Sequence, residues 1–313
     1  MHTLLRILTY LKPHRKRLAL TYGCIAAVTG LNLAIPWIIR QVIDVGLATG
    51  DRRYLLQMAF LIVGIAATRV VFSFGQRFGM ESSGQKVAYD VRNQLYDHIQ
   101  RLSFAYHTHA QTGQLMSRMA EVVGAFQRFV AGALLDSVSI VLMLGFIIAI
   151  LLQMSWQLAL IALIPMPFLA FSVQYLAAQM RPRWKQVQQA FAQVTTVLQE
   201  NLTGAQVVRA FARELHEIAK FDVANKDYMR TRLSTIRFWG SASPFMGFLV
   251  VCSVALTFWF GGPLVMAGAL SLGALVAFSS YIRLLSGPVQ RLGNIVNLTA
   301  EALACAERIF EVL

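Results

Sequence analysis

His107 and His109 are the residues of this sequence whose type and spacing come closest to a metal site. A zinc site needs three or four ligands, and no further His, Cys or acidic cluster lies beside these two, which favours a polar turn. Cys24, Cys252 and Cys305 are far apart and form no C-x-x-C pair. We interpret them as small buried apolar side chains, so neither set of residues predicts a metal site.

The sequence also lacks the motifs of nucleotide binding and nucleophilic catalysis. It has no G-x-x-x-x-G-K-S/T segment and no glycine-rich loop that could hold phosphates. It shows no nucleophile elbow and no paired carboxylates within one apolar segment. We therefore expect no ATP site, no bound cofactor or metal and no catalytic residue in this chain, and the sequence leaves open whether it is part of an enzyme.

The composition indicates that much of the chain is surrounded by lipid. Of its 313 residues, 57% are hydrophobic and only 14% are charged, and the mean hydropathy is +0.56. Soluble domains carry roughly 25% charged residues, and no soluble fold of this length could bury so much apolar surface. The net charge of +13 collects between the apolar stretches, as in cytoplasmic loops, which argues against binding of nucleic acid.

Four apolar stretches set the number of membrane crossings. They are Leu18–Ile39, Tyr54–Gln76, Ser137–Met180 and Phe238–Ile282. A crossing needs about 20 residues, so the first two stretches make one each. Each of the others would be roughly 66 Å long as a single helix, twice the ~30 Å of hydrocarbon, and must fold back. We expect turns at Gln153–Gln157 and in the segment containing Gly261–Pro263 and Ala267–Gly268, which gives six transmembrane helices.

Arg69, Asp136 and Arg283 are ionisable residues within or beside these stretches. A charge in lipid is costly and usually faces a polar cavity or a partner. We expect Arg283 to line a substrate cavity together with Arg69, and Asp136 is a third candidate. The alternative is that each side chain extends to the membrane interface or pairs internally. That alternative is favoured for Asp136, and for Arg283 the two interpretations stay open.

The basic residues place both termini in the cytoplasm. Six crossings bring the termini to one side, and Lys and Arg gather in residues 1–17, 77–128 and 181–237. Residues 1–17 have apolar side chains at helical spacing and are expected to form an elbow helix in the interface. A signal peptide is the alternative, but the following apolar stretch is long for one and no cleavage site follows. We expect a multi-pass plasma-membrane protein, and the lack of a transit peptide favours a bacterial inner membrane.

Two long segments between crossings are predicted to form cytoplasmic helical hairpins. Residues 77–128 and 181–237 carry apolar residues every three or four positions, interleaved with charges. Each has one break, at His107–Gly113 and at Asn201–Gly204, and arms of about 25 residues would reach ~35 Å beyond the membrane. The expected fold class is all-α, with six transmembrane helices and long cytoplasmic extensions. Such extensions suggest a cytoplasmic partner, although a stalk that only stiffens the bundle is an alternative.

Four segments of the chain resemble the transmembrane domain of an ATP-binding cassette (ABC) exporter, of the half-transporter type whose six helices precede a nucleotide-binding domain. They are Leu11–His14, which resembles the opening elbow; Thr112–Arg118 and Glu200–Phe211, which resemble the two coupling segments; and Ala304–Leu313, which resembles the junction with the nucleotide-binding domain. The resemblance covers nearly the whole chain, because these segments occur in the family's order on a frame of six crossings.

The resemblance implies that two such subunits, identical or different, pair in the lipid bilayer. Each would be coupled to a nucleotide-binding domain that binds ATP and Mg²⁺, fused or separate, through helices near 112–118 and 203–211. The resemblance assigns this contact to Thr112, Gly113, Gln114 and Leu115 in the first hairpin and to Gly204, Val207, Val208 and Phe211 in the second. Residues 18–313 would form the transmembrane domain. We expect the nucleotide-binding domain to be absent from this chain, which is then either truncated or a separate subunit.

The function implied is that of the membrane half of an ATP-driven exporter, of the multidrug and lipid type, for an amphipathic compound, a lipid or a peptide. An ion-coupled secondary transporter is one alternative, but such carriers usually show inverted repeats and broken helices with intramembrane acids. A membrane anchor for a signalling protein is another, and it would not need two long hairpins. The sequence does not identify the cargo.

Overall fold

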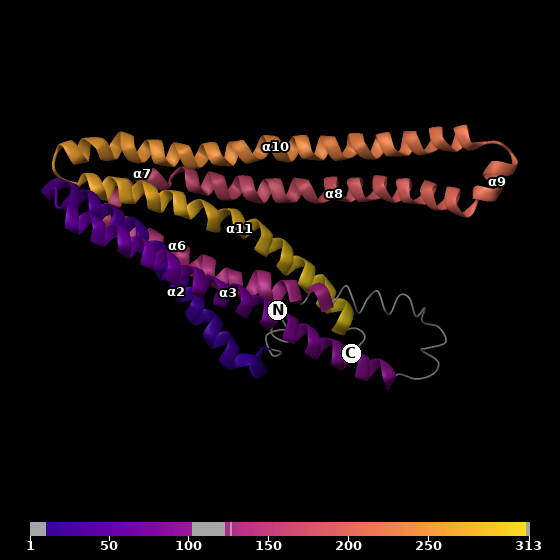
Figure 1. Cartoon of the computed structure of the whole chain (residues 1–313), viewed down its shortest axis with the longest axis horizontal. Helices are drawn as coiled ribbons and strands as arrows, with labels where there is room; N and C mark the ends of the chain where they lie inside the picture. The colour runs from indigo at the N-terminus through magenta and orange to yellow at the C-terminus, as the bar shows by residue number, and fades with distance from the viewer. Residues whose placement is uncertain (1–10, 102–122, 126, 311–313) are drawn as a thin grey trace. The chain divides into compact units, whose positions relative to one another are not determined.

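The computed structural model describes residues 11–101, 123–125 and 127–310, and Figure 1 shows them as long helices joined by short turns. The expected all-α fold class is confirmed, since these residues contain no strand. In chain order the elements are the 3-10 turn η1 (Lys12–His14), α2 (Arg15–Gln41), the π-helical turn η2 (Val42–Leu47), α3 (Arg52–Gln100), the π-helical turn η3 (Phe129–Leu134), α6 (Leu135–Met154), α7 (Trp156–Leu163), α8 (Pro165–Thr203), α9 (Ala205–Ala210), α10 (Glu214–Met266) and α11 (Leu272–Phe310).

Within the described residues, six helical segments are long and apolar enough to cross a membrane. They are Lys12–Leu47, Arg52–Gln100, Val123–Met154, Trp156–Thr203, Glu214–Met266 and Leu272–Ala300. Several exceed a crossing: α3 has 49 residues and α10 has 53, which correspond to about 74 and 80 Å against ~30 Å of hydrocarbon. The apolar spans therefore continue as unbroken helices into the charged segments.

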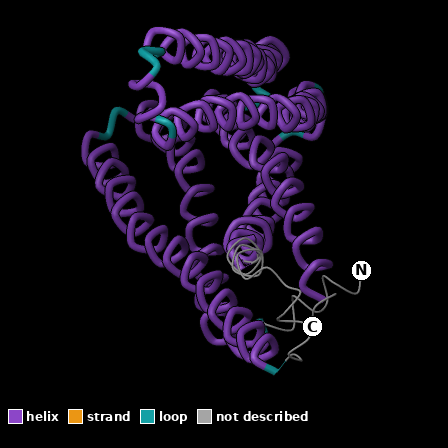
Figure 2. Tube along the Cα trace, turned by 90° about the vertical axis from the view of Figure 1, so that its right-hand side faces the viewer, coloured by secondary structure: helices purple, strands orange, loops and turns teal. Residues whose placement is uncertain are grey.

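The chain divides into two compact units, residues 1–166 with 252–313 and residues 167–251. In the first unit, α2 packs along α3, and α11 packs against α2 and α6. Figure 2 shows that the described residues are almost entirely helical. One buried cluster joins Val87, Val91 and Leu95 of α3 to Phe129 and Val130 of η3. The α3 members recur every four positions, so the cluster buries one face of the amphipathic part of this helix.

The second unit is an antiparallel hairpin of α8 and the first part of α10, joined by α9. Three contacts fix its register: the Arg183 guanidinium lies 4.0 Å from the Phe238 ring centroid, the Phe191 and Tyr228 ring centroids lie 5.4 Å apart, and Lys220 bonds Glu200. Positions rise along α8 as they fall along α10, as an antiparallel pair requires. The break that separates α8 from α9 lies at Gly204, within the predicted segment Asn201–Gly204.

Ser155 separates the third and fourth crossings, within the predicted turn segment Gln153–Gln157. Its backbone is extended, with φ −166° and ψ 105°. Its Oγ accepts a hydrogen bond from the Leu158 amide at 3.4 Å, so the residue caps the start of α7. A serine at this position thus ends one helix and begins the next.

The turn before the sixth crossing lies after Met266, because α10 continues through Gly261–Pro263. Gly268 takes a φ of +70° in this turn, a conformation that favours glycine. Gly261 has a packing role instead: a Cβ there would overlap Leu275 of α11 and contact Leu158 of α7. Gly261, which suggested a turn in the sequence, therefore allows close helix packing.

The first hairpin is described only in part. Its first arm is the end of α3, which runs to Gln100. The predicted coupling residues Thr112, Gly113, Gln114 and Leu115 lie outside the described residues, as do His107 and His109. Of the predicted elbow, Lys12–His14 form η1 and α2 begins at Arg15.

Candidate transport and coupling sites

The short helix α9 lies at the tip of the α8–α10 hairpin (Figure 1). The Gly204 carbonyl accepts hydrogen bonds from the amides of Val207 and Val208 at 2.9 and 3.0 Å, and the Gly204 amide donates to the Glu200 carbonyl at 2.8 Å. Gly204 therefore ends α8 and starts α9. At the other end, Ala212 has a φ of +46°, the left-handed conformation that commonly terminates a helix.

Helix α9 and its flanks carry an exposed apolar surface. Val207 is 60% exposed and Phe211 75% exposed. The two residues are four positions apart and thus lie on one face of the turn, whereas Val208 is half-buried. Leu202 and Leu215, on either side of α9, are also exposed. Exposed apolar side chains gathered at the end of a rigid hairpin are typical of a protein docking surface.

An ion pair connects α8 and α10 just below α9. The Lys220 ammonium donates a hydrogen bond to Glu200 Oε2 at 2.8 Å. This hydrogen bond, helped by the charges of Glu200 and Glu217, raises the pKa of Lys220 above its ordinary value of 10.5. Because folding raises the pKa of Lys220, the pair contributes its full stabilisation below the unfolded pKa of 10.5. This stabilisation is lost only as the pH rises through the higher pKa of the folded chain. The pair is solvent-exposed, so its contribution is small and mainly fixes the register below α9.

The predicted cavity residues lie on three different helices. Arg69 is on α3, Asp136 on α6 and Arg283 on α11. Both arginine side chains are exposed. Arg283 shares a stripe of α11 with the exposed Gly287 and Arg291, which follow it by four and eight positions.

Asp136 is brought together with Arg291, a residue that the sequence did not single out. Arg291 Nη1 lies 3.4 Å from Asp136 Oδ1, and the two side chains are 60% and 19% exposed. The pair joins α6 to the exposed stripe of α11. Asp136 therefore pairs within the chain with Arg291, and not with Arg69 or Arg283.

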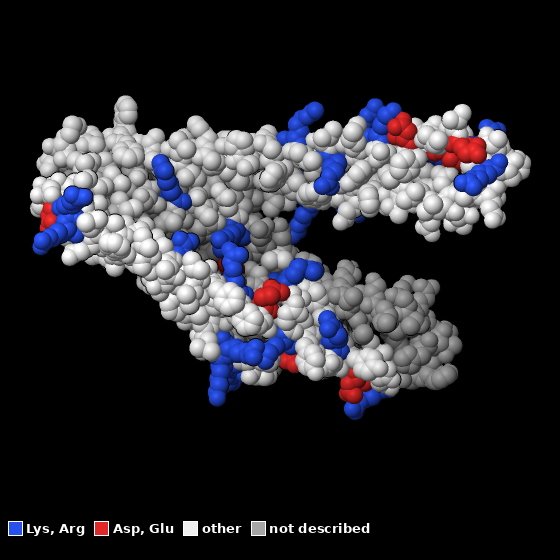
Figure 3. Space-filling model, viewed as in Figure 1, with Lys and Arg blue, Asp and Glu red and all other residues white. Residues whose placement is uncertain are grey.

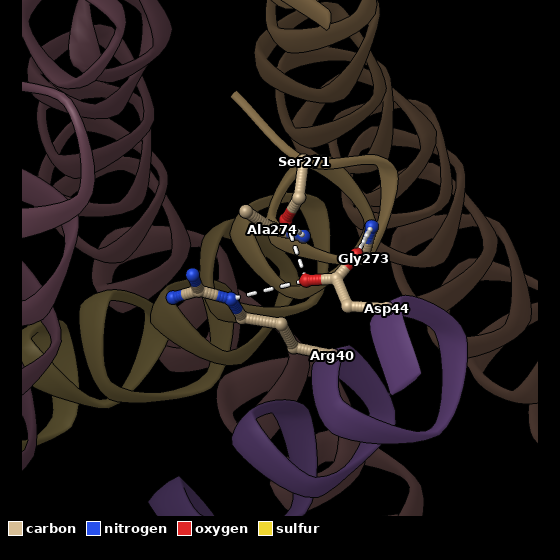
Figure 4. Close-up of polar contacts among 5 residues, drawn as sticks. All are labelled: Arg40, Asp44, Ser271, Gly273 and Ala274. Atoms are coloured by element: carbon tan, nitrogen blue, oxygen red, sulfur yellow. Dashed lines mark hydrogen bonds and ion pairs between the residues drawn. The ribbon is translucent and has the colours of Figure 1, made fainter. Parts of the chain in front are cut away.

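Asp44 is the centre of a polar cluster at the junction of η2 and the start of α11 (Figure 4). Its Oδ2 accepts a hydrogen bond from Ser271 Oγ at 2.5 Å, and its Oδ1 accepts one from the Gly273 amide at 2.8 Å. Arg40 Nε, one turn earlier in α2, lies 3.4 Å from Oδ2. The carboxylate therefore caps the N-terminus of α11, where its charge also suits the helix dipole.

Ser271 completes this cap, since its Oγ also accepts a hydrogen bond from the Ala274 amide at 3.1 Å. A second link joins α2 to α11 within the apolar region, where the buried Tyr281 hydroxyl donates to the Leu33 carbonyl at 2.8 Å. The only sequence signal for Asp44 was its spacing of four residues from Arg40. Its partner Ser271 lies 227 positions away, so the sequence alone did not reveal the cluster.

No group of three His, Cys, Asp or Glu side chains that could bind a metal ion is found among the residues that the structure describes. The polar contacts of Asp44, Asp136 and Tyr281 instead connect different helices.

The chain matches the family model of the ABC transporter transmembrane region over residues 18–289. It is 30% identical to an uncharacterised ABC transporter ATP-binding protein, YknU of Bacillus subtilis, over 100% of this chain and 54% of that protein. It is 29% identical to an ATP-dependent lipid A-core flippase of Syntrophus aciditrophicus, over 98% of this chain and 51% of that protein.

A third relative is a putative multidrug export ATP-binding/permease protein, YgaD of Bacillus subtilis, which is 27% identical over 100% of this chain and 55% of its own length. The chain thus spans about half the length of the curated relatives it matches. The matched region includes all six apolar helices, wholly or in large part. Six apolar helical segments, several of which extend well beyond the length of a crossing, together with these matches, show that the chain belongs to the ABC transporter transmembrane region family.

Proposed function

We propose that this chain forms the membrane pathway of an ATP-driven exporter that moves an amphipathic compound, a lipid or a peptide out of the cytoplasm. The main support is the continuity of the second hairpin. Helix α10 runs without interruption for 53 residues, from beside α9 to the turn before the sixth crossing. A continuous helix moves as a rigid lever, so a displacement of α9 would reach the apolar segments of α8 and α10.

We place ATP and Mg²⁺ in a nucleotide-binding domain, fused or separate, that contacts α9. The exposed apolar pair Val207 and Phe211 supports this contact. One relative's name describes an ATP-dependent flippase, and another's combines export with ATP binding. In the first hairpin, residues 112–118 are the other proposed contact with a nucleotide-binding domain. Coupling through these two surfaces would join ATP-driven closure to a change in the membrane pathway.

We also propose that a second transmembrane subunit, identical or similar, pairs with this chain in the bilayer. Large apolar side chains of the second unit are exposed, including Phe168 at 62% and Phe248 at 60%. A partner helix or lipid must cover such side chains within a membrane protein. The distribution of Lys and Arg supports cytoplasmic termini, and the bacterial relatives support a bacterial inner membrane.

The test is transport by proteoliposomes that contain the complete exporter, meaning this chain with its nucleotide-binding domain. We expect uptake of a fluorescent amphiphile into inside-out vesicles to require hydrolysable ATP and to survive a protonophore. Transport that persists without ATP and stops when the proton gradient collapses would overturn the proposal and favour an ion-coupled carrier.

Arg283→Ala is expected to change the ratio of transport rates for anionic and cationic amphiphiles by roughly tenfold, since one charge contact in a low-dielectric cavity is worth about 1.4 kcal/mol or more. The exposed stripe of α11 that carries Arg283 supports its place in the proposed cavity. Arg52→Ala, at the start of α3, removes an exposed arginine that precedes the apolar stretch Tyr54–Gln76 and serves as the control. Unchanged preference in Arg283→Ala would mean that its side chain extends to the membrane interface instead.

A further inference from the structure

We infer that the second unit binds the phosphate group of an anionic phospholipid, where the apolar parts of α8 and α10 end. Two reciprocal arginine–aromatic contacts mark the place. The Arg183 guanidinium of α8 lies 4.0 Å from the centroid of the Phe238 ring of α10. The Arg232 guanidinium of α10 lies 5.6 Å from the centroid of the Trp184 ring of α8. Each helix thus provides an arginine to a ring of the other.

These contacts lie at the boundary between apolar and charged sequence. Residues 165–180 of α8 and residues 238–266 of α10 carry no charge, and basic residues begin directly beyond them. They are Arg181, Arg183 and Lys185 on α8 and Arg230, Arg232 and Arg237 on α10. In Figure 3 the hairpin is white toward its apolar end and carries blue spheres from about its middle outward. Tryptophans favour the membrane interface, and Trp184 and Trp239 are 45% and 55% exposed.

The basic residues of this boundary have no acidic residues near them in sequence on either helix. No Asp or Glu occurs in residues 165–199 of α8 or in residues 228–266 of α10. The Arg183 Nε is shielded from solvent and has no hydrogen-bond acceptor among the described residues. An unpaired, shielded N–H is costly. The ion pairs Lys220–Glu200 and Lys226–Asp222 lie closer to α9. A negative partner for Arg183 would therefore come from outside the chain.

Phosphate matches the chemistry of this site. A guanidinium stacked on an aromatic ring has its plane fixed, and its in-plane N–H groups form a fork that matches two phosphate oxygens. Exposed apolar side chains beside the arginines, Leu233 at 49% and Ile236 at 47%, would contact acyl chains rather than water. A phospholipid combines both features, whereas a free phosphate ion offers only the first. The inference goes beyond the proposed export function and does not depend on ATP or on a nucleotide-binding domain.

The test is native mass spectrometry of the full chain in detergent, titrated with phosphatidylglycerol and, separately, with phosphatidylcholine. We expect Arg183→Gln to weaken phosphatidylglycerol binding roughly tenfold, the loss expected for one charge-assisted hydrogen-bonded contact. Lys226→Gln is the control, because it removes one positive charge from the same hairpin at a position away from the boundary. We expect its affinity for phosphatidylglycerol to be almost that of the unchanged chain. Size-exclusion chromatography and helical circular dichroism establish that each variant is folded.

Arg183→Lys separates the guanidinium fork from charge alone. We expect it to lose most of the affinity that Arg183→Gln loses, because an ammonium neither stacks in the same way nor offers paired donors. The inference is overturned if Arg183→Lys binds normally or if Lys226→Gln loses as much as Arg183→Gln, since attraction would then be unspecific. Displacement of the lipid by inorganic phosphate at equal concentration would also overturn it, because the site would then bind a free anion.

Discussion

Replacing Phe211 by alanine is expected to lower transport by the complete exporter at least tenfold while ATP hydrolysis continues. Phe211 is 75% exposed at the end of α9, so its loss leaves the hairpin intact but removes an aromatic anchor from the proposed contact with the nucleotide-binding domain. Truncation of such an anchor typically costs ~2 kcal/mol or more, which is more than a factor of ten in an equilibrium. The measurement is ATP hydrolysis and amphiphile uptake in the same proteoliposomes.

Val223→Ala is the matched control for this variant. Val223 is 69% exposed and lies on α10 outside α9 and its flanks, so its replacement tests a general loss of apolar surface from the same hairpin. Phe211→Leu keeps an apolar side chain and should restore much of the transport. Equal transport by Phe211→Ala and the unchanged exporter would show that α9 does not use this side chain for coupling.

Gly273→Ala is expected to destabilise the chain by about 1–3 kcal/mol, the usual cost of overpacking. A Cβ at this position would lie 2.5 Å from the Arg40 carbonyl oxygen and 2.6 Å from Asp44 Oδ1. The first of these is a backbone atom of α2, so the clash cannot be relieved by rotating a side chain. Moving Asp44 away would also weaken the hydrogen bonds that cap α11.

Gly262→Ala provides the comparison, because a Cβ there meets no atom within 4 Å. Alanine is favoured over glycine in a helix by roughly 0.5–1 kcal/mol, so this variant should be neutral or slightly more stable. The midpoint of thermal unfolding in detergent, followed by tryptophan fluorescence, distinguishes the two. A midpoint for Gly273→Ala that equals that of Gly262→Ala would show that α2 and α11 are not in close contact at Asp44.

Some packing roles could not be predicted because they depend on neighbours that are distant in sequence. Gly261–Pro263 has the composition of a turn, yet α10 continues through it and Gly261 contributes to packing against α7 and α11. A glycine looks the same in the sequence whether it lies in a turn or in a close helix contact. The difference depends on the helix that packs against it, and the residues of that helix lie far away in the sequence.

The sequence by itself determined the class of the protein, because hydrophobicity and helical periodicity are local properties. Apolar length gave the six crossings, and the polar break at Gln153–Gln157 contains the observed turn at Ser155. Only the tertiary structure decided which charges from distant segments meet. Asp136 pairs with Arg291 across 155 positions, and Asp44 caps α11 from η2 across more than two hundred. Such pairs form when helices from distant parts of the chain pack together, so no pattern within one segment can specify them.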